Sequence, residues 1–175
     1  MSKQPLFCLA RGRQAGVSLI EVLVAILIIS IGVLGYAGLQ LRALNSTEHA
    51  HYMTQATALA QDVVERVAAN PQQFATYANP DNWDQTLMGE TLPSNWNACL
   101  GTGADCTPAQ MAESDILQAR WFASQMLPNG TVLGEECEDS MAFCITVAWS
   151  GQSAEDCTVG SANCVLMEAI TWATN

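Results

Sequence analysis

Basic residues are scarce in this chain. Six lysine and arginine residues stand against 17 aspartate and glutamate residues, which gives a formal net charge of −11 at pH 7. A nucleic-acid-binding domain needs a basic face. Beyond residue 16, however, only Arg42, Arg66 and Arg120 are available, and they are scattered along the sequence. We therefore exclude direct nucleic-acid binding, and we expect the acidic surface to keep a globular domain soluble and to bias which partners it accepts.

Signatures of catalysis are also missing. The sequence contains no Gly-x-Ser-x-Gly motif, phosphate loop or dinucleotide fingerprint. His49 and His51 are two positions apart on a predicted helix, so they point to different sides of it. The acidic run from Glu135 to Asp139 lacks the spacing of a calcium loop, and we interpret it as a solvated turn. The sequence predicts a protein that is not an enzyme and binds neither a cofactor nor a metal.

Charged side chains are absent from a long apolar run near the N-terminus, between Val22 and Leu39. The run is long enough to cross a bilayer, because about 20 helical residues span a hydrocarbon core of ~30 Å. One carboxylate, Glu21, lies at its start. An unpaired charge in hydrocarbon costs roughly 2.5–3.5 kcal/mol, so Glu21 implies a partner. An ordinary signal anchor and a buried core helix are the alternative interpretations of the run.

The residues before the run narrow these alternatives. Lys3, Arg11 and Arg13 are the only charged residues there, and the positive-inside rule places such a segment in the cytoplasm. The small residues Ala15 and Gly16 precede the apolar run, whereas a secretory signal has its small cleavage-site residues after it. Cleavage after Gly16 would remove a basic leader and keep the apolar helix.

The segment Gly-Val-Ser-Leu-Ile-Glu-Val-Leu, residues 16–23, resembles the class III signal of type IV prepilins and type II secretion pseudopilins. The resemblance implies that a prepilin peptidase cleaves between Gly16 and Val17, and that the new amine of Val17 is N-methylated. It also implies that Glu21 neutralises the Val17 amine of a neighbouring subunit when a subunit docks into a fibre. One departure is Val17 itself, since the family usually has Phe at this position.

This interpretation divides the chain into three segments. Residues 1–16 form the leader peptide, residues 17–44 the transmembrane and assembly half of the N-terminal helix, and residues 45–175 a periplasmic globular domain that includes the outer half of that helix. Apolar residues recur at three- and four-residue spacing as far as Val67, which predicts an amphipathic helix. Asn70-Pro71 ends it, because proline disfavours helix at the residue before it.

Further elements follow the helix. Residues 74–107 are rich in turn and helix-breaking residues, whereas residues 108–126 predict a helix with Thr107 as its N-cap. Residues 143–149 and 165–172 predict strands, and residues 131–133 a short edge strand. We therefore expect an α+β fold of the type IV pilin kind. The outer half of its long N-terminal helix packs against a small antiparallel sheet, and disulfides staple the loops of the domain.

The cysteines fit an extracytoplasmic domain. Cys8 falls in the leader, and the other six form three successive pairs with six residues between partners. Six cysteines allow 15 connectivities, but the repeated spacing favours closure within each pair, and zinc ligands favour shorter spacings. Disulfides are the preferred interpretation on the periplasmic side of the membrane. The candidate bonds are Cys99 to Cys106, Cys137 to Cys144 and Cys157 to Cys164.

A second resemblance rests on the long N-terminal helix and on short motifs after it. Four short motifs of this chain resemble those of the minor pilins of type IV pili. They are Glu65-Arg66, Asn70-Pro71, residues 127–130 (Leu-Pro-Asn-Gly) and residues 147–149 (Val-Ala-Trp). The cysteine-bounded connectors match no pattern. The resemblance implies an inner-membrane protein that later enters the pilus with other minor pilins and the major pilin. It also implies a priming complex that can hold a PilY-type adhesin at the tip. A minor pseudopilin of a type II secretion system remains the alternative, since it shares the N-terminal signal.

The cysteine pattern makes a direct prediction. Because all six cysteines beyond the leader are expected to be oxidised after export, the mature protein should react with no thiol-alkylating reagent unless it is first reduced. Mass spectrometry after alkylation, with and without reductant, measures this. Six alkylated cysteines in the unreduced sample would contradict the disulfide interpretation.

Overall fold

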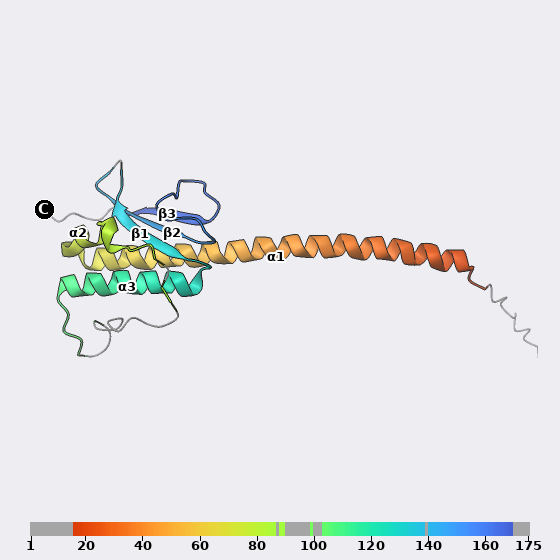
Figure 1. Cartoon of the computed structure of the whole chain (residues 1–175), viewed down its shortest axis with the longest axis horizontal. Helices are drawn as coiled ribbons and strands as arrows, with labels where there is room; N and C mark the ends of the chain where they lie inside the picture. Colours follow the sequence, from red (N-terminus) through yellow and green to blue (C-terminus); the bar gives the residue numbers. More distant parts are fainter. Residues whose placement is uncertain (1–15, 87, 90–98, 100–102, 139, 170–175) are drawn as a thin grey trace, which may run out of the picture. The chain divides into compact units, whose positions relative to one another are not determined.

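The computed structural model of the chain describes residues 16–86, 88–89, 99, 103–138 and 140–169. The chain divides into two units, residues 1–45 and 46–175, and helix α1 (Leu19–Ala69) runs from the first into the second (Figure 1). The basic residues of the predicted leader and the last residues of the predicted strand 165–172 lie outside the described residues.

Helix α1 ends as its sequence predicts. Its last residue is Ala69, and Pro71 follows in the sequence. The backbone N–H of Asn70 donates to the carbonyl of Arg66 at 3.1 Å, which closes the last turn. Within residues 46–69 one stripe is buried, and this confirms the amphipathic outer half. The stripe consists of Ala56, Leu59, Ala60, Val63 and Val67.

Three short helices follow α1, so the prediction of a loop from residue 74 is wrong in its first part. They are η1 (Pro71–Gln73), α2 (Phe74–Tyr77) and η2 (Pro80–Asn82). Each 3₁₀-helix starts at a proline, whose fixed φ favours the first helical position. The Trp83 indole N–H donates to the carbonyl of Tyr77 at 2.7 Å, and this bond anchors the segment to the core.

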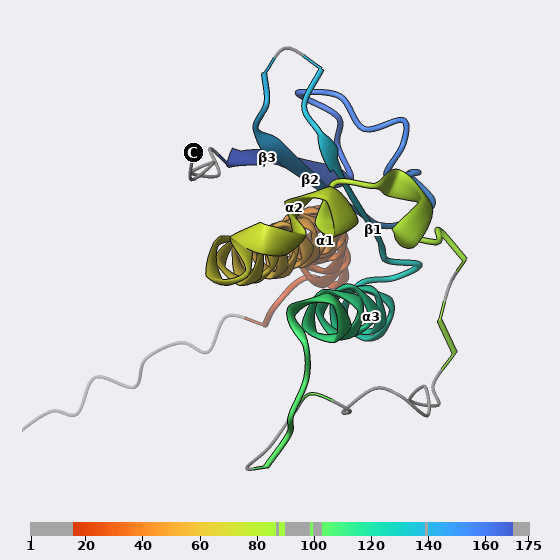
Figure 2. The same cartoon turned by 90° about the vertical axis from the view of Figure 1, so that its left-hand side faces the viewer.

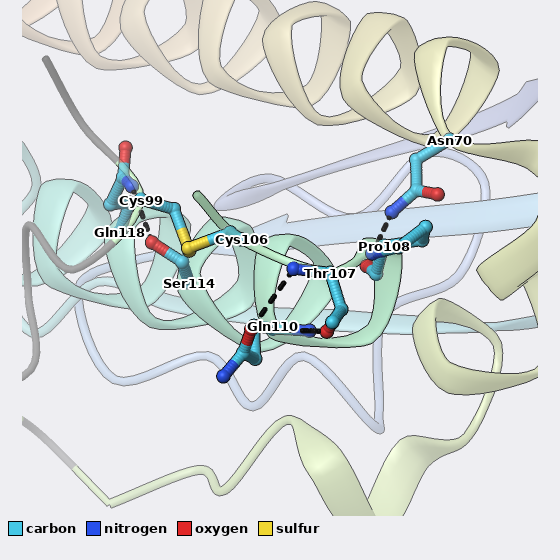
Figure 3. The surroundings of a disulfide bond; sticks show 8 residues. All are labelled: Asn70, Cys99, Cys106, Thr107, Pro108, Gln110, Ser114 and Gln118. Atoms are coloured by element: carbon cyan, nitrogen blue, oxygen red, sulfur yellow. Dashed lines mark hydrogen bonds between the residues drawn. A yellow bond between two sulfur atoms is a disulfide. The ribbon is translucent and has the colours of Figure 1, made fainter. Parts of the chain in front are cut away.

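Helix α3 (Pro108–Met126) has the predicted bounds. Its start is fixed by a capping box, in which the Thr107 side chain accepts from the Gln110 N–H at 3.3 Å and the Gln110 side chain accepts from the Thr107 N–H at 2.9 Å (Figure 3). Such reciprocal bonds satisfy N–H groups that a helix leaves without partners. The Asn70 side chain donates to the carbonyl of Pro108 at 2.8 Å, so the end of α1 is joined to the start of α3.

The sheet is antiparallel, with the order β1-β2-β3. Its strands are β1 (Thr131–Glu136), β2 (Phe143–Ala148) and β3 (Cys164–Ala169). The predicted strands at 143–149 and 165–172 are confirmed within the described residues, and β1 is longer than the predicted edge. Glu135 and Glu136 belong to β1, which corrects the interpretation of residues 135–139 as a turn.

The core lies where the buried stripe of α1 meets α2, α3 and the sheet (Figure 2). Every residue of β2 is buried, as expected for the central strand. Trp83 and Trp149 are the largest fully buried side chains among the described residues. This arrangement confirms the α+β fold of the type IV pilin kind, with the outer half of the helix on a three-stranded antiparallel sheet.

Gly134 on β1 has no room for a side chain. A Cβ atom built there would lie 2.7 Å from the Trp83 indole. We expect Gly134→Ala to destabilise the fold by about 1–3 kcal/mol, the usual cost of overpacking a core. The control is Gly89→Ala, because nothing lies within 4 Å of a Cβ built at Gly89. Denaturant unfolding of both variants measures the difference, and equal stability would contradict this account of the Trp83 contact.

Candidate functional site

The first described residues form a segment that precedes the helix. Gly16, Val17 and Ser18 are not helical, and α1 starts at Leu19. A Cβ atom at Gly16 would meet nothing within 4 Å, so the packing of this chain does not require glycine at that position. A requirement for glycine would therefore come from a protein that approaches the backbone closely, as a peptidase does.

Glu21 lies in the first turn of α1. Its backbone N–H donates to the carbonyl of Ser18 at 2.9 Å. A carboxylate in this position is favoured by the positive end of the helix dipole. The dipole contribution is smaller than the cost of a charge in hydrocarbon, so it does not replace a cationic partner.

The apolar part of α1 is exposed among the described residues. Every described residue from Gly16 to Ala50 is exposed, and this includes large apolar side chains such as Ile31 and Leu34. The Ser30 hydroxyl donates to the carbonyl of Ile26 at 2.7 Å, so it brings no unpaired donor into an apolar surrounding. By length and composition, α1 is the one helix among the described residues that could cross a membrane.

The structure contains the three disulfides that the spacing favours. Their Cα–Cα distances are 5.6 Å for Cys99–Cys106, 5.1 Å for Cys137–Cys144 and 6.1 Å for Cys157–Cys164. The first bond lies beside the capping box of α3 (Figure 3). The second closes the hairpin between β1 and β2, and the third closes part of the connector between β2 and β3. Each therefore fixes a loop at the end of a regular element.

A partly buried ionic network joins α1, α2 and α3, and the sequence did not predict it. The Arg66 guanidinium donates to Asp115 at 2.8 Å, to Asp62 at 2.7 Å and to Gln118 at 3.1 Å. The Tyr77 hydroxyl donates to the other oxygen of Asp115 at 2.6 Å. The only signal in the sequence is that Asp115 lies among the small and apolar residues of the buried side of α3.

The network shifts the pKa of both its donors. Burial, together with the hydrogen bond to Asp115, raises the pKa of Tyr77 far above its usual value. Burial alone would lower the pKa of Arg66, but the hydrogen bonds to Asp115 and Asp62 outweigh it and raise that pKa. Tyr77 therefore stays protonated and Arg66 stays charged, and both remain donors to Asp115 at physiological pH.

The two histidines do not lie together. The His49 ring lies 6.2 Å from the Trp149 ring, and the His51 ring lies 6.0 Å from the Tyr52 ring, so each histidine has a different aromatic neighbour. Within the part of the chain that the structure describes, no group of three or more His, Cys, Asp and Glu side chains could hold a metal ion.

Two family models match the chain. A model of the prokaryotic N-terminal methylation motif matches residues 11–37, and a model described as type IV pilin Tt1218 matches residues 38–117. No curated protein and no solved structure matches the chain. The two adjoining matches, together with the fold, support a type IV pilin. Pilins are structural, non-catalytic subunits that a prepilin peptidase processes and that assemble with other pilins.

The network predicts unequal effects of removing two carboxylates. Asp115→Asn removes a carboxylate that accepts from both Arg66 and Tyr77, while Arg66 keeps its pair with Asp62, so we expect a loss of about 1–3 kcal/mol of stability. The control is Asp84→Asn, which breaks an ion pair with Arg120 at 3.3 Å in which Asp84 is exposed; exposed pairs contribute little. Unfolding curves from tryptophan fluorescence measure both, and equal losses would contradict a structural role of the network.

The exposed Gly16 segment predicts a steric requirement at the expected cleavage site. Gly16→Ala should mostly preserve leader removal, whereas Gly16→Glu should abolish it and leave the longer chain in the membrane. A Cβ atom at Gly16 meets no described residue within 4 Å, and Gly16 lies outside the unit of residues 46–175, so the fold of that unit should not change. Gel mobility of the membrane-bound protein measures the result. Normal processing of Gly16→Glu would contradict peptidase recognition here.

Proposed function

We propose that this chain is a minor pilin subunit that joins a priming or tip complex for type IV pilus assembly. The observation that carries the proposal is the position of Glu21. It is the only charged residue between Arg13 and Arg42, it lies in the first turn of a helix whose next 20 residues are exposed, and it follows Gly16 and Val17 at the spacing of the prepilin signal.

Assembly in this proposal depends on the pairing of two charges. A prepilin peptidase cleaves between Gly16 and Val17 and releases the leader, residues 1–16, and the Val17 amine is then methylated. The amine is a cation near the start of the helix, and the Glu21 carboxylate of a neighbouring subunit neutralises it. Both charges are then paired inside the fibre, where an unpaired charge would be expensive.

The proposed location follows from the basic leader. Lys3, Arg11 and Arg13 keep the N-terminus in the cytoplasm, residues 17–44 lie in the inner membrane, and residues 45–175 form the periplasmic domain. Three disulfides in that domain fit an oxidising compartment. After assembly the subunit lies in the pilus, at or near its tip.

The proposed minor role rests on the pattern after the helix. Four motifs resemble those of the minor pilin PilV. They are Glu65-Arg66, Asn70-Pro71, the Leu-Pro-Asn-Gly of residues 127–130 and the strand that ends before Trp149. Such subunits assemble with other minor pilins and the major pilin, and their complex can hold a PilY-type adhesin. Arg66 and Arg120, the only basic residues of residues 46–175, are both in ion pairs, which supports a role without direct binding of nucleic acid.

The alternative is a minor pseudopilin of a type II secretion system. The N-terminal segment favours a pseudopilin and a pilin equally, because both have the cleavage signal and the apolar helix. A deletion of the gene separates the two: loss of twitching motility supports the pilus, whereas loss of exoprotein secretion with normal motility supports the secretion system.

The test of the pairing is Glu21→Val. Removal of a charge from an apolar helix lowers the cost of membrane insertion by a few kcal/mol, so the variant should be inserted, stable and cleaved at Gly16. It should be absent from sheared pili, because the partner of the Val17 amine is gone. The matched control is Ser30→Val, which removes a polar group from the same helix but no charge. Glu21→Val protein at the wild-type level in pili would contradict the mechanism.

A further inference from the structure

The two edges of the sheet differ. The outer side of β1 is covered: the Gln85 side chain donates to the carbonyl of Val132 at 2.9 Å, and both η2 and α3 contact this strand. Strand β3 lies at the opposite edge (Figure 2). Among the described residues, nothing forms a hydrogen bond to the backbone of residues 164–169 apart from the ladder with β2.

The ladder shows which backbone groups face this free edge. The Trp149 N–H donates to the carbonyl of Asn163 at 3.0 Å, and bonded and non-bonded pairs alternate along antiparallel strands. Along the register of β2 and β3, the pairs of Leu166 with Thr146 and of Glu168 with Cys144 are therefore non-bonded. The N–H and C=O groups of Leu166 and Glu168 therefore point away from β2. By the same alternation, the Val132 carbonyl on β1 points away from β2, and there it accepts the hydrogen bond from the Gln85 side chain.

The side chains of β3 protect the edge only weakly. Natural edge strands are commonly blocked by charged side chains, especially lysine, by proline or by a bulge. Strand β3 contains neither lysine nor proline, its register with β2 is uninterrupted, and Glu168 is its one charged residue. On one face Leu166 is 39% exposed. Glu168 lies next to it on that face, and one of the Glu168 carboxylate oxygens accepts a hydrogen bond from the Ser140 hydroxyl at 2.6 Å. On the other face Val165 and Met167 are partly buried and pack against the core.

The charge of the domain indicates which kind of partner strand can pair with the free edge of β3. Residues 46–175 contain every acidic residue except Glu21, and both of their arginines are already paired within the domain. The same domain of a second copy would therefore bring acidic groups and no unpaired arginine to the edge. We infer that the free edge of β3 is a docking surface for a strand of a different protein, with apolar residues on its inner face and a basic residue beside Glu168.

This inference concerns the sheet and not the route of α1 into a fibre, so it is tested without pilus assembly. The probe is a short fluorescent peptide of alternating valine and threonine with one arginine on its threonine face. A second peptide has glutamate in place of arginine. A third keeps the arginine but carries N-methyl groups on alternate backbone nitrogens, so that it has the same charge but cannot pair as a strand. Binding to the full chain in detergent is measured by fluorescence anisotropy.

We expect the arginine peptide to bind and the other two to bind at least about tenfold more weakly, because strand pairing and charge are both required. Leu166→Pro removes an N–H that faces the edge and takes no part in the β2 ladder, so it should abolish binding while the fold persists. Leu166→Thr, which keeps the N–H, is the matched control and should still bind the arginine peptide.

Glu168→Arg provides a test that does not depend on how well the proline variant folds. It should invert the preference, so that the glutamate peptide binds better than the arginine peptide. Equal binding of all three peptides, no binding of any, or an unchanged preference in Glu168→Arg would overturn the inference. A concentration-dependent dimer that Leu166→Pro abolishes would also overturn it, since the occupant would then be a second copy of this chain.

Discussion

One helix has to satisfy two different surroundings, and the rest of the structure depends on this constraint. From Leu19 to Leu44 every residue of α1 is exposed, and most of its side chains there are apolar, so the burial of this surface would require an apolar surrounding outside the described residues. From Ala56 to Val67 only one stripe is buried, and the domain itself covers it. Glu21 fits an apolar surrounding only with a cation beside it, and under the proposed function that cation is the Val17 amine of a neighbouring subunit.

The domain that covers the second half is small, and cross-links supplement its core. Each disulfide closes a short loop, for which chain entropy gives on the order of 2–3 kcal/mol. The Arg66–Asp115–Tyr77 network adds directional contacts between three helices. A buried pair of this kind need not add net stability compared with an apolar substitute. Its geometry specifies instead how α3 lies against α1, since Arg66 and Asp115 are 49 residues apart in sequence.

Local signals in the sequence predicted the regular elements well. Asn70-Pro71 ends α1, and Thr107 with Pro108 and Gln110 starts α3, because capping depends on residues within one turn. The cysteine spacing likewise favoured the bonds that the structure contains. The short helices of residues 71–82 and the bond from Gln85 to Val132 were not predictable, because they depend on how Trp83 and β1 pack. At the candidate site, residue types and spacing predicted the prepilin signal. The structure adds that Gly16 precedes the helix and that no described residue lies within 4 Å of a Cβ built there. The free edge of β3 became visible only once the sheet order was known.

The central claim is that the chain is cut between Gly16 and Val17 and enters a fibre in that form. The most direct measurement is the intact mass of the wild-type protein, recovered separately from membranes and from sheared fibres. The account predicts a chain that starts at Val17 in both fractions, heavier by one methyl group where the amine is methylated. A chain that still starts at Met1 in the membrane, with none in the fibre fraction, would contradict it.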